Sequence, residues 1–174
     1  MSSNKFTLKL VAIFALVFVI AGCSDKTAAV DSAKTPNLQS KTIHLEVYKS
    51  PTCGCCEKWL DHIHDRGFES KIHNFHDLSV TKEEQGIAPR YRSCHTAISP
   101  DGYAFEGHVP AKYIQQFLQQ KHASDVIGLS VPAMPIGTPG MEVADKFQPY
   151  RILLLKTDGS YEIYAHIQSY KEQF

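Results

Sequence analysis

Four cysteines carry the chemistry that the sequence offers. Cys53, Cys55 and Cys56 stand within four residues, and Cys94 follows further along the chain. Bridging adjacent residues or a Cys-x-Cys pair strains a disulfide, so Cys53 with Cys56 is the favourable pair. Cys55 and Cys94 can pair only if their side chains point the same way. Two structural disulfides, expected in an oxidising compartment, are therefore one interpretation of the four thiols.

A metal cluster is the interpretation that we favour. The free N–H groups and the dipole at a helix N-terminus lower the pKa of nearby thiols, which makes thiolates available as soft ligands. Such ligands prefer Cu(I) to hard cations, and zinc in a closed four-thiolate shell is the main rival. The Cys-Gly-Cys-Cys run packs its sulfurs more tightly than a Cys-x-x-Cys zinc knuckle does, which favours a polynuclear copper–thiolate cluster.

Alternation and turn residues predict the elements that must position these thiols. Residues 43–48 alternate like a strand, Trp59, Leu60 and Ile63 form one face of a helix, and Trp59 and Phe68 are expected in the core. The predicted strands are 43–48, 68–75, 92–99, 103–108, 151–155 and 161–167, and the predicted helices are 55–66, 77–85 and 111–121. Residues 128–141 hold three prolines and three glycines, which indicates an ordered loop.

This order, strand–helix–strand–helix–strand–strand–helix, predicts an α/β fold of the thioredoxin-like class with a C-terminal loop and β-hairpin extension. In that class, the residue before the third strand lies against the N-terminus of the first helix and is usually a cis-proline. Ser93-Cys94-His95-Thr96 occupies the position here. We therefore expect Cys94 to face Cys53–Cys56.

Histidine and methionine residues supply further candidate ligands. His108 follows a strand and glycine, and His95 adjoins Cys94; of the two, His108 is favoured. Met134 and Met141 lie in the Pro/Gly loop, where no helical stripe explains them, and thioether sulfur suits Cu(I). Four other histidines are expected on exposed faces or strands: His62, His64, His73 and His76.

The N-terminus has the order of a secretory signal, with Lys5 and Lys9, an apolar run, and small residues before Cys23. Residues 20–23 (IAGC) are similar to the lipobox of bacterial lipoproteins, which predicts a signal peptide over 1–22 and lipidation of Cys23. A plain cleaved signal or an uncleaved anchor is the alternative. Residues 23–41 are predicted to be a flexible tether, and 42–174 the folded domain. Ser24 favours a periplasmic location on the outer membrane over the inner one.

Charge and hydropathy exclude other classes. The 174 residues hold 18 Lys and Arg against 18 Asp and Glu. A balanced chain without a basic run does not attract phosphate backbones, so no nucleic-acid partner is expected. Since no apolar run reaches about 18 residues, a polytopic membrane protein is excluded, and membrane contact is expected only through the lipid anchor.

Four motifs in order resemble the CopG family of bacterial copper-resistance proteins, over about residues 43–141. The motifs lie at residues 50–56 (SPTCGCC, with Trp59), 93–97 (SCHTA), 106–111 (EGHVPA), and 128–135 with 137–141 (GLSVPAMP and GTPGM).

The resemblance implies a periplasmic thioredoxin-like protein, found with copper-efflux components, that holds copper in a polynuclear cysteine cluster and interconverts Cu(I) and Cu(II). Carried over by motif, the ligands are the four cysteines Cys53, Cys55, Cys56 and Cys94, and the further candidates are His108, Met134 and Met141. A thiol-disulfide oxidoreductase that uses Cys53 and Cys56 is the main alternative function. A metallochaperone without redox chemistry is another.

Overall fold

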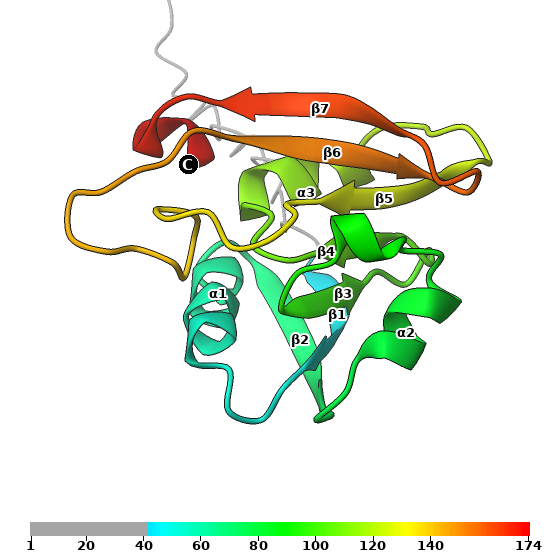
Figure 1. The fold of residues 1–174 in the computed structure, drawn as a ribbon, viewed down its shortest axis with the longest axis horizontal. Helices are drawn as coiled ribbons and strands as arrows, with labels where there is room; N and C mark the ends of the chain where they lie inside the picture. Colours follow the sequence, from blue (N-terminus) through cyan, green and yellow to red (C-terminus); the bar gives the residue numbers. More distant parts are fainter. Residues whose placement is uncertain (1–41) are drawn as a thin grey trace, which may run out of the picture. The chain divides into compact units, whose positions relative to one another are not determined.

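The computed structural model describes residues 42–174, and the predicted signal peptide, Cys23 and tether lie outside them. Within these residues, seven strands form one mixed sheet in the order β2-β1-β3-β4-β5-β6-β7 (Figure 1). The strands are β1 Ile43–Lys49, β2 Phe68–Asn74, β3 His95–Ile98, β4 Ala104–Glu106, β5 Val126–Ser130, β6 Tyr150–Lys156 and β7 Tyr161–Ile167. The helices are α1 Gly54–His64, α2 Ser79–Glu84 and α3 Ala111–Leu118, with 3-10 turns η1 Pro89–Tyr91 and η2 Tyr170–Gln173.

The predicted order of elements is confirmed from β1 to α3, and the C-terminal hairpin β6–β7 extends the sheet. β1 pairs in parallel with β2 and antiparallel with β3, which in turn pairs antiparallel with β4. The pattern places the loop after β1 and the start of β3 at the same end of the sheet. That end holds the cysteines.

One expectation about the loop was wrong. Residues 128–130 belong to strand β5, which lies between β4 and β6. Gly128 permits the pairing, because a Cβ there would stand 1.9 Å from the Ala104 carbonyl oxygen of the neighbouring strand. The glycine that indicated a loop in the sequence is thus required for a close approach of two backbones.

Side-chain alternation gives the sheet two apolar faces. Trp59 of α1 and Phe117 of α3 cover one face, where they join Phe105 of β4 in the main core. The neighbouring residue Ala104 points to the opposite face and packs with Ile87, in the segment between α2 and η1. Trp59 is fully buried and Phe68 is 3% exposed, which confirms their predicted places in the core.

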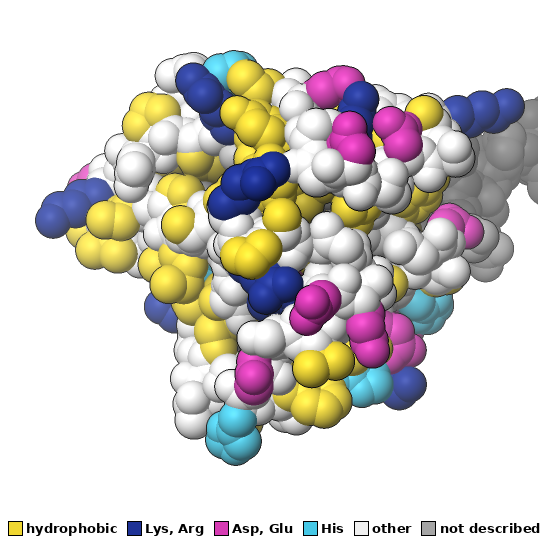
Figure 2. All heavy atoms as spheres, turned by 45° about the vertical axis from the view of Figure 1, so that its right-hand side comes forward, with side chains coloured by type: hydrophobic (Ala, Val, Ile, Leu, Met, Phe, Trp, Pro, Cys, Tyr) yellow, Lys and Arg dark blue, Asp and Glu magenta, His cyan; other side chains and the backbone are white. Residues whose placement is uncertain are grey.

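The described surface carries charges of both signs. On the face in Figure 2, basic and acidic side chains both occur, with apolar side chains between them. Among the described residues, no helix has the length and apolar character needed to cross a bilayer.

Candidate metal centre

The cysteine motif forms the N-terminal turn of α1. After β1 ends, the Cys53 N–H donates to the Ser50 carbonyl at 3.2 Å and closes the turn that leads into the helix. Cys53 is the N-cap residue, and Cys55 and Cys56 lie in the first helical turn. Cys56 is fully buried, whereas Cys53 and Cys55 are half-buried. The packing of Trp59 in the core thus fixes the helix that presents the sulfurs.

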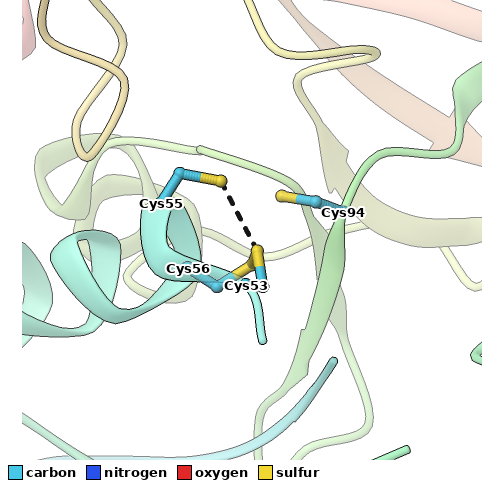
Figure 3. A group of neighbouring side chains, drawn as sticks. All are labelled: Cys53, Cys55, Cys56 and Cys94. Atoms are coloured by element: carbon cyan, nitrogen blue, oxygen red, sulfur yellow. Dashed lines mark hydrogen bonds between the residues drawn. A yellow bond between two sulfur atoms is a disulfide. The ribbon is translucent and has the colours of Figure 1, made fainter. Parts of the chain in front are cut away.

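Cys53 and Cys56 form a disulfide with their Cα atoms 5.3 Å apart, which is the pair that the sequence favours. Cys55 and Cys94 are free thiols, so the interpretation as two structural disulfides is not met. Cys55 Sγ lies 3.4 Å from Cys53 Sγ (Figure 3). The structure therefore shows the oxidised form of one cysteine pair and the reduced form of the other two thiols.

Cys94 joins the motif from the segment before β3, as the sequence predicts. Its sulfur and those of Cys53, Cys55 and Cys56 all lie within 4.8 Å of one another. Figure 3 shows the Cys94 side chain directed from the segment before β3 toward the N-terminal end of α1. Burial and the neighbouring Cys55 raise the pKa of the Cys94 thiol to about 12.

Two histidines complete a second group of donors around Cys94. Its sulfur lies 3.0 Å from His108 Nε2 and 3.3 Å from His95 Nδ1. His108 Nδ1 donates to the Pro139 carbonyl at 2.7 Å, which leaves Nε2 as the unprotonated ring nitrogen facing Cys94. Burial lowers the pKa of both rings, so both are neutral and able to bind a metal near neutral pH.

His95 contributes more than the sequence indicated. Its ring is fully buried against Trp59, with the centroids 4.2 Å apart. Among the described residues, one buried side-chain nitrogen or oxygen atom has no hydrogen-bond partner, and that atom is His95 Nε2. Such atoms are rare in folded proteins and call for an explanation, such as a bound ion. Adjacency to Cys94 was the signal in the sequence, but His108 was ranked above His95.

The predicted methionine ligands occupy different environments in the loop between β5 and β6. Met134 is 47% exposed, whereas Met141 is half-buried. Met141 directly follows Gly140, whose position lies against the Cys55 carbonyl oxygen and His108 Nδ1. The loop therefore covers the first turn of α1 at Gly140, the residue before Met141. Met134 lies on the surface.

Replacing Gly140 by alanine is expected to lift this loop from α1. Gly140 has φ of +88°, and a Cβ there would stand 2.6 Å from the Cys55 carbonyl oxygen and 2.8 Å from the Trp59 nitrogen. The strain should lower the free energy of unfolding by about 1–3 kcal/mol, measured in urea. Gly54→Ala, which meets no atom within 4 Å, is the control in the same motif. Equal stability of the two variants would contradict the expectation.

These observations define a mixed α/β protein with a cluster of cysteines and histidines that can hold a metal ion. A search of the solved structures found "Copper resistance protein copG- Form 1", with 33% sequence identity and a TM-score of 0.68 over 74% of this chain and 100% of that one. Form 2 of the same protein matches with 34% identity and a TM-score of 0.67 over 73% and 99%. The chain belongs to the CopG family.

Residues 91–141 match the family described as "Protein of unknown function, DUF411". That range begins just before Cys94 and ends at Met141, so it includes both histidines of the cluster and the covering loop. No curated protein sequence matches the chain significantly.

Proposed function

We propose that the protein binds Cu(I) as its cargo in the reduced cysteine–histidine cluster and that it serves copper resistance. One observation supports this proposal most directly. Four sulfurs from two separate segments lie within 4.8 Å of one another, and imidazole nitrogens lie beside Cys94. Thiolate is a soft ligand that suits Cu(I), imidazole also binds copper, and adjacent thiolates can bridge several ions. The similar solved structures are of a copper resistance protein, which supports copper over zinc.

Copper loading competes with the disulfide for the same sulfurs. Cys53 and Cys56 must each regain a thiol before they can bind copper, which takes two electrons and two protons. An external dithiol supplies both: it becomes a disulfide as the Cys53–Cys56 bond breaks into two thiols. Because Cys56 is fully buried and Cys53 is half-buried, the incoming thiolate attacks Cys53 and releases Cys56.

The same pair can reduce copper, and we include this step in the proposal. Two Cu(II) ions each accept one electron as Cys53 and Cys56 form their disulfide and release two protons. The products are two Cu(I) ions beside Cys55, Cys94, His95 and His108, which remain available as soft ligands. Reduction of Cu(II) to Cu(I) is thereby coupled to two of the four cysteines, and the external dithiol returns that pair to its thiol form.

The wider setting of the proposal comes from the sequence and from strand pairing. The order β2-β1-β3-β4, with α1 after β1, supports a thioredoxin-like core extended by β5 and the hairpin β6–β7.

Lipidation at Cys23 would hold this domain in the periplasm, on the outer membrane, through residues 24–41. Copper-efflux components are the expected partners.

A thiol-disulfide oxidoreductase is the second candidate, and the Cys53–Cys56 disulfide at the start of α1 favours it. However, Cys94 in the segment before β3 lies against the same sulfurs, and His95 and His108 stand beside Cys94. A substrate disulfide would have to enter where these side chains stand. We therefore rank disulfide exchange as the step that prepares the copper site.

Anaerobic titration with Cu(I) tests the proposal. The protein reduced with a dithiol, which is then removed, is expected to bind several copper ions per chain, whereas the disulfide form binds fewer. Metal content by mass spectrometry and free thiols counted in parallel give both numbers. A matched titration with Zn(II), followed by Cu(I), tests metal preference. Absence of copper binding, or equal copper in both forms, would contradict the proposal.

A further inference from the structure

A buried ion pair lies behind Cys94, on the face of the sheet opposite α1. Glu106 of β4 is fully buried, and its Oε1 accepts a hydrogen bond from Lys82 Nζ of α2 at 2.5 Å. Lys82 is 5% exposed. Removing both charges from water is costly, and no part of the fold described so far requires them. The pair therefore calls for a functional explanation.

The carboxylate of Glu106 holds the chain on both sides of Cys94-His95. Its Oε1 also accepts the Ser93 backbone N–H at 2.5 Å, just before Cys94. Its Oε2 accepts the Thr96 hydroxyl at 2.6 Å, just after His95, and Thr96 is the direct cross-strand partner of Glu106. One side chain thereby fixes both ends of the dipeptide that supplies a sulfur and an imidazole.

The two residues after Glu106 extend the same arrangement to His108. The Gly107 N–H donates to the His95 carbonyl at 2.9 Å. A Cβ at Gly107 would stand 2.6 Å from Ser93 Oγ, so glycine is needed for this close approach. His108 then places Nε2 3.0 Å from Cys94 Sγ. The register between β3 and β4 thus sets the distance between these two donors.

We propose that the buried Lys82–Glu106 pair is a positioning device for the half of the copper site formed by Cys94, His95 and His108. Glu106 orients the segment through Ser93 and Thr96, and Lys82 compensates the carboxylate charge and contacts Thr96 Oγ1 at 3.0 Å. Neither residue binds the metal. The inference rests on the proposed copper function and adds α2, which holds none of the candidate ligands.

The double variant K82M/E106L tests this role while avoiding an unpaired buried charge. Replacing both partners by apolar side chains of similar size often preserves folding, so a cooperative unfolding transition is expected. The affinity of the reduced protein for Cu(I), measured against a chromophoric chelator, should fall about 10- to 100-fold. The ultraviolet thiolate-to-copper band should also change shape. The single variant Lys82→Arg keeps a cation beside Glu106, so its copper affinity and its ultraviolet band should match those of the wild type.

A core variant separates positioning from general stability. Ile167→Ala on β7 removes a fully buried side chain from the core and is expected to lower stability without changing the copper affinity. Wild-type copper binding by K82M/E106L would overturn the inference. The inference would also be overturned if Ile167→Ala lost as much affinity for Cu(I) as K82M/E106L at matched stability.

A readout without copper distinguishes failure of this inference from failure of the copper function. In the disulfide form Cys55 and Cys94 are the free thiols of the described residues, and peptide mass spectrometry separates their alkylation by iodoacetamide. K82M/E106L should speed alkylation of Cys94 severalfold and leave Cys55 unchanged. If the double variant does not fold, K82M/E106Q serves instead, with the same expectation, because it also removes both charges. Unchanged alkylation of Cys94 would overturn the inference even if the wild type binds copper.

Discussion

Cys94→Ser is expected to remove most of the bound copper and to leave the domain folded. Cys94 is the sulfur that joins the first turn of α1 to the segment before β3, and it also faces His108. A serine oxygen is a hard donor that does not bridge Cu(I), so the affinity should fall at least about 100-fold. Serine has nearly the same shape, which preserves packing. Copper per chain, measured anaerobically by mass spectrometry, checks the result.

The control for Cys94→Ser is Ser93→Ala, which changes the neighbouring side chain and removes no metal donor. Retention of full copper by Cys94→Ser would contradict the shared site. The oxidoreductase alternative gives a different pattern, since reduction of insulin disulfides would survive Cys55→Ser and Cys94→Ser and depend on Cys53 and Cys56 alone. The same set of variants therefore separates the two functions.

Local sequence determined the parts of the fold that were predicted correctly. The helical spacing of Trp59, Leu60 and Ile63 gave α1, because one apolar stripe must face the sheet. Asp101-Gly102 and Asp158-Gly159 gave the two hairpin turns, since these pairs suit tight turns. β5 was partly missed, because Gly128 is explained only by the backbone of β4, which is distant in sequence.

The site shows the same division between local and distant information. The cysteine motif and Cys94 could be brought together from the order of elements alone. The Lys82–Glu106 pair could not, because two charged residues in separate elements reveal their pairing only when the fold places them together. The disulfide between Cys53 and Cys56 was the favoured geometry, but the sequence contains no information on which redox form is present.

His62 is the clearest correction among the histidines. It was expected on an exposed face of the helix, yet it is 8% exposed, and its ring packs edge-on against Phe174. Its Nε2 accepts the Ala111 backbone N–H at 3.1 Å. The start of α3 and the C-terminal residue both bury this ring. Neither contact could be inferred from the helical pattern of α1.

This burial predicts a loss of stability in acid. Burial, with a smaller contribution from Arg66, lowers the pKa of His62 to about 3, whereas an unfolded histidine titrates near 6.5. Below pH 6.5 the unfolded chain binds a proton that the folded protein does not, so the stabilisation present at neutral pH is lost as the pH falls toward 3. At pH 5 the loss from this residue alone is about 2 kcal/mol.

His62→Gln isolates this contribution, because glutamine keeps an oxygen that can accept the Ala111 N–H but does not titrate. Urea unfolding of the metal-free disulfide form at pH 7.5 and pH 5 gives the free energies of unfolding. The difference between wild type and variant should change by about 2 kcal/mol between the two pH values, in favour of the variant at pH 5. His64→Gln, on the exposed side of the same helix, is the control and should follow the wild type. If His62→Gln loses as much stability as the wild type on acidification, the ring is protonated in the folded protein and the buried contact with Ala111 does not hold it neutral.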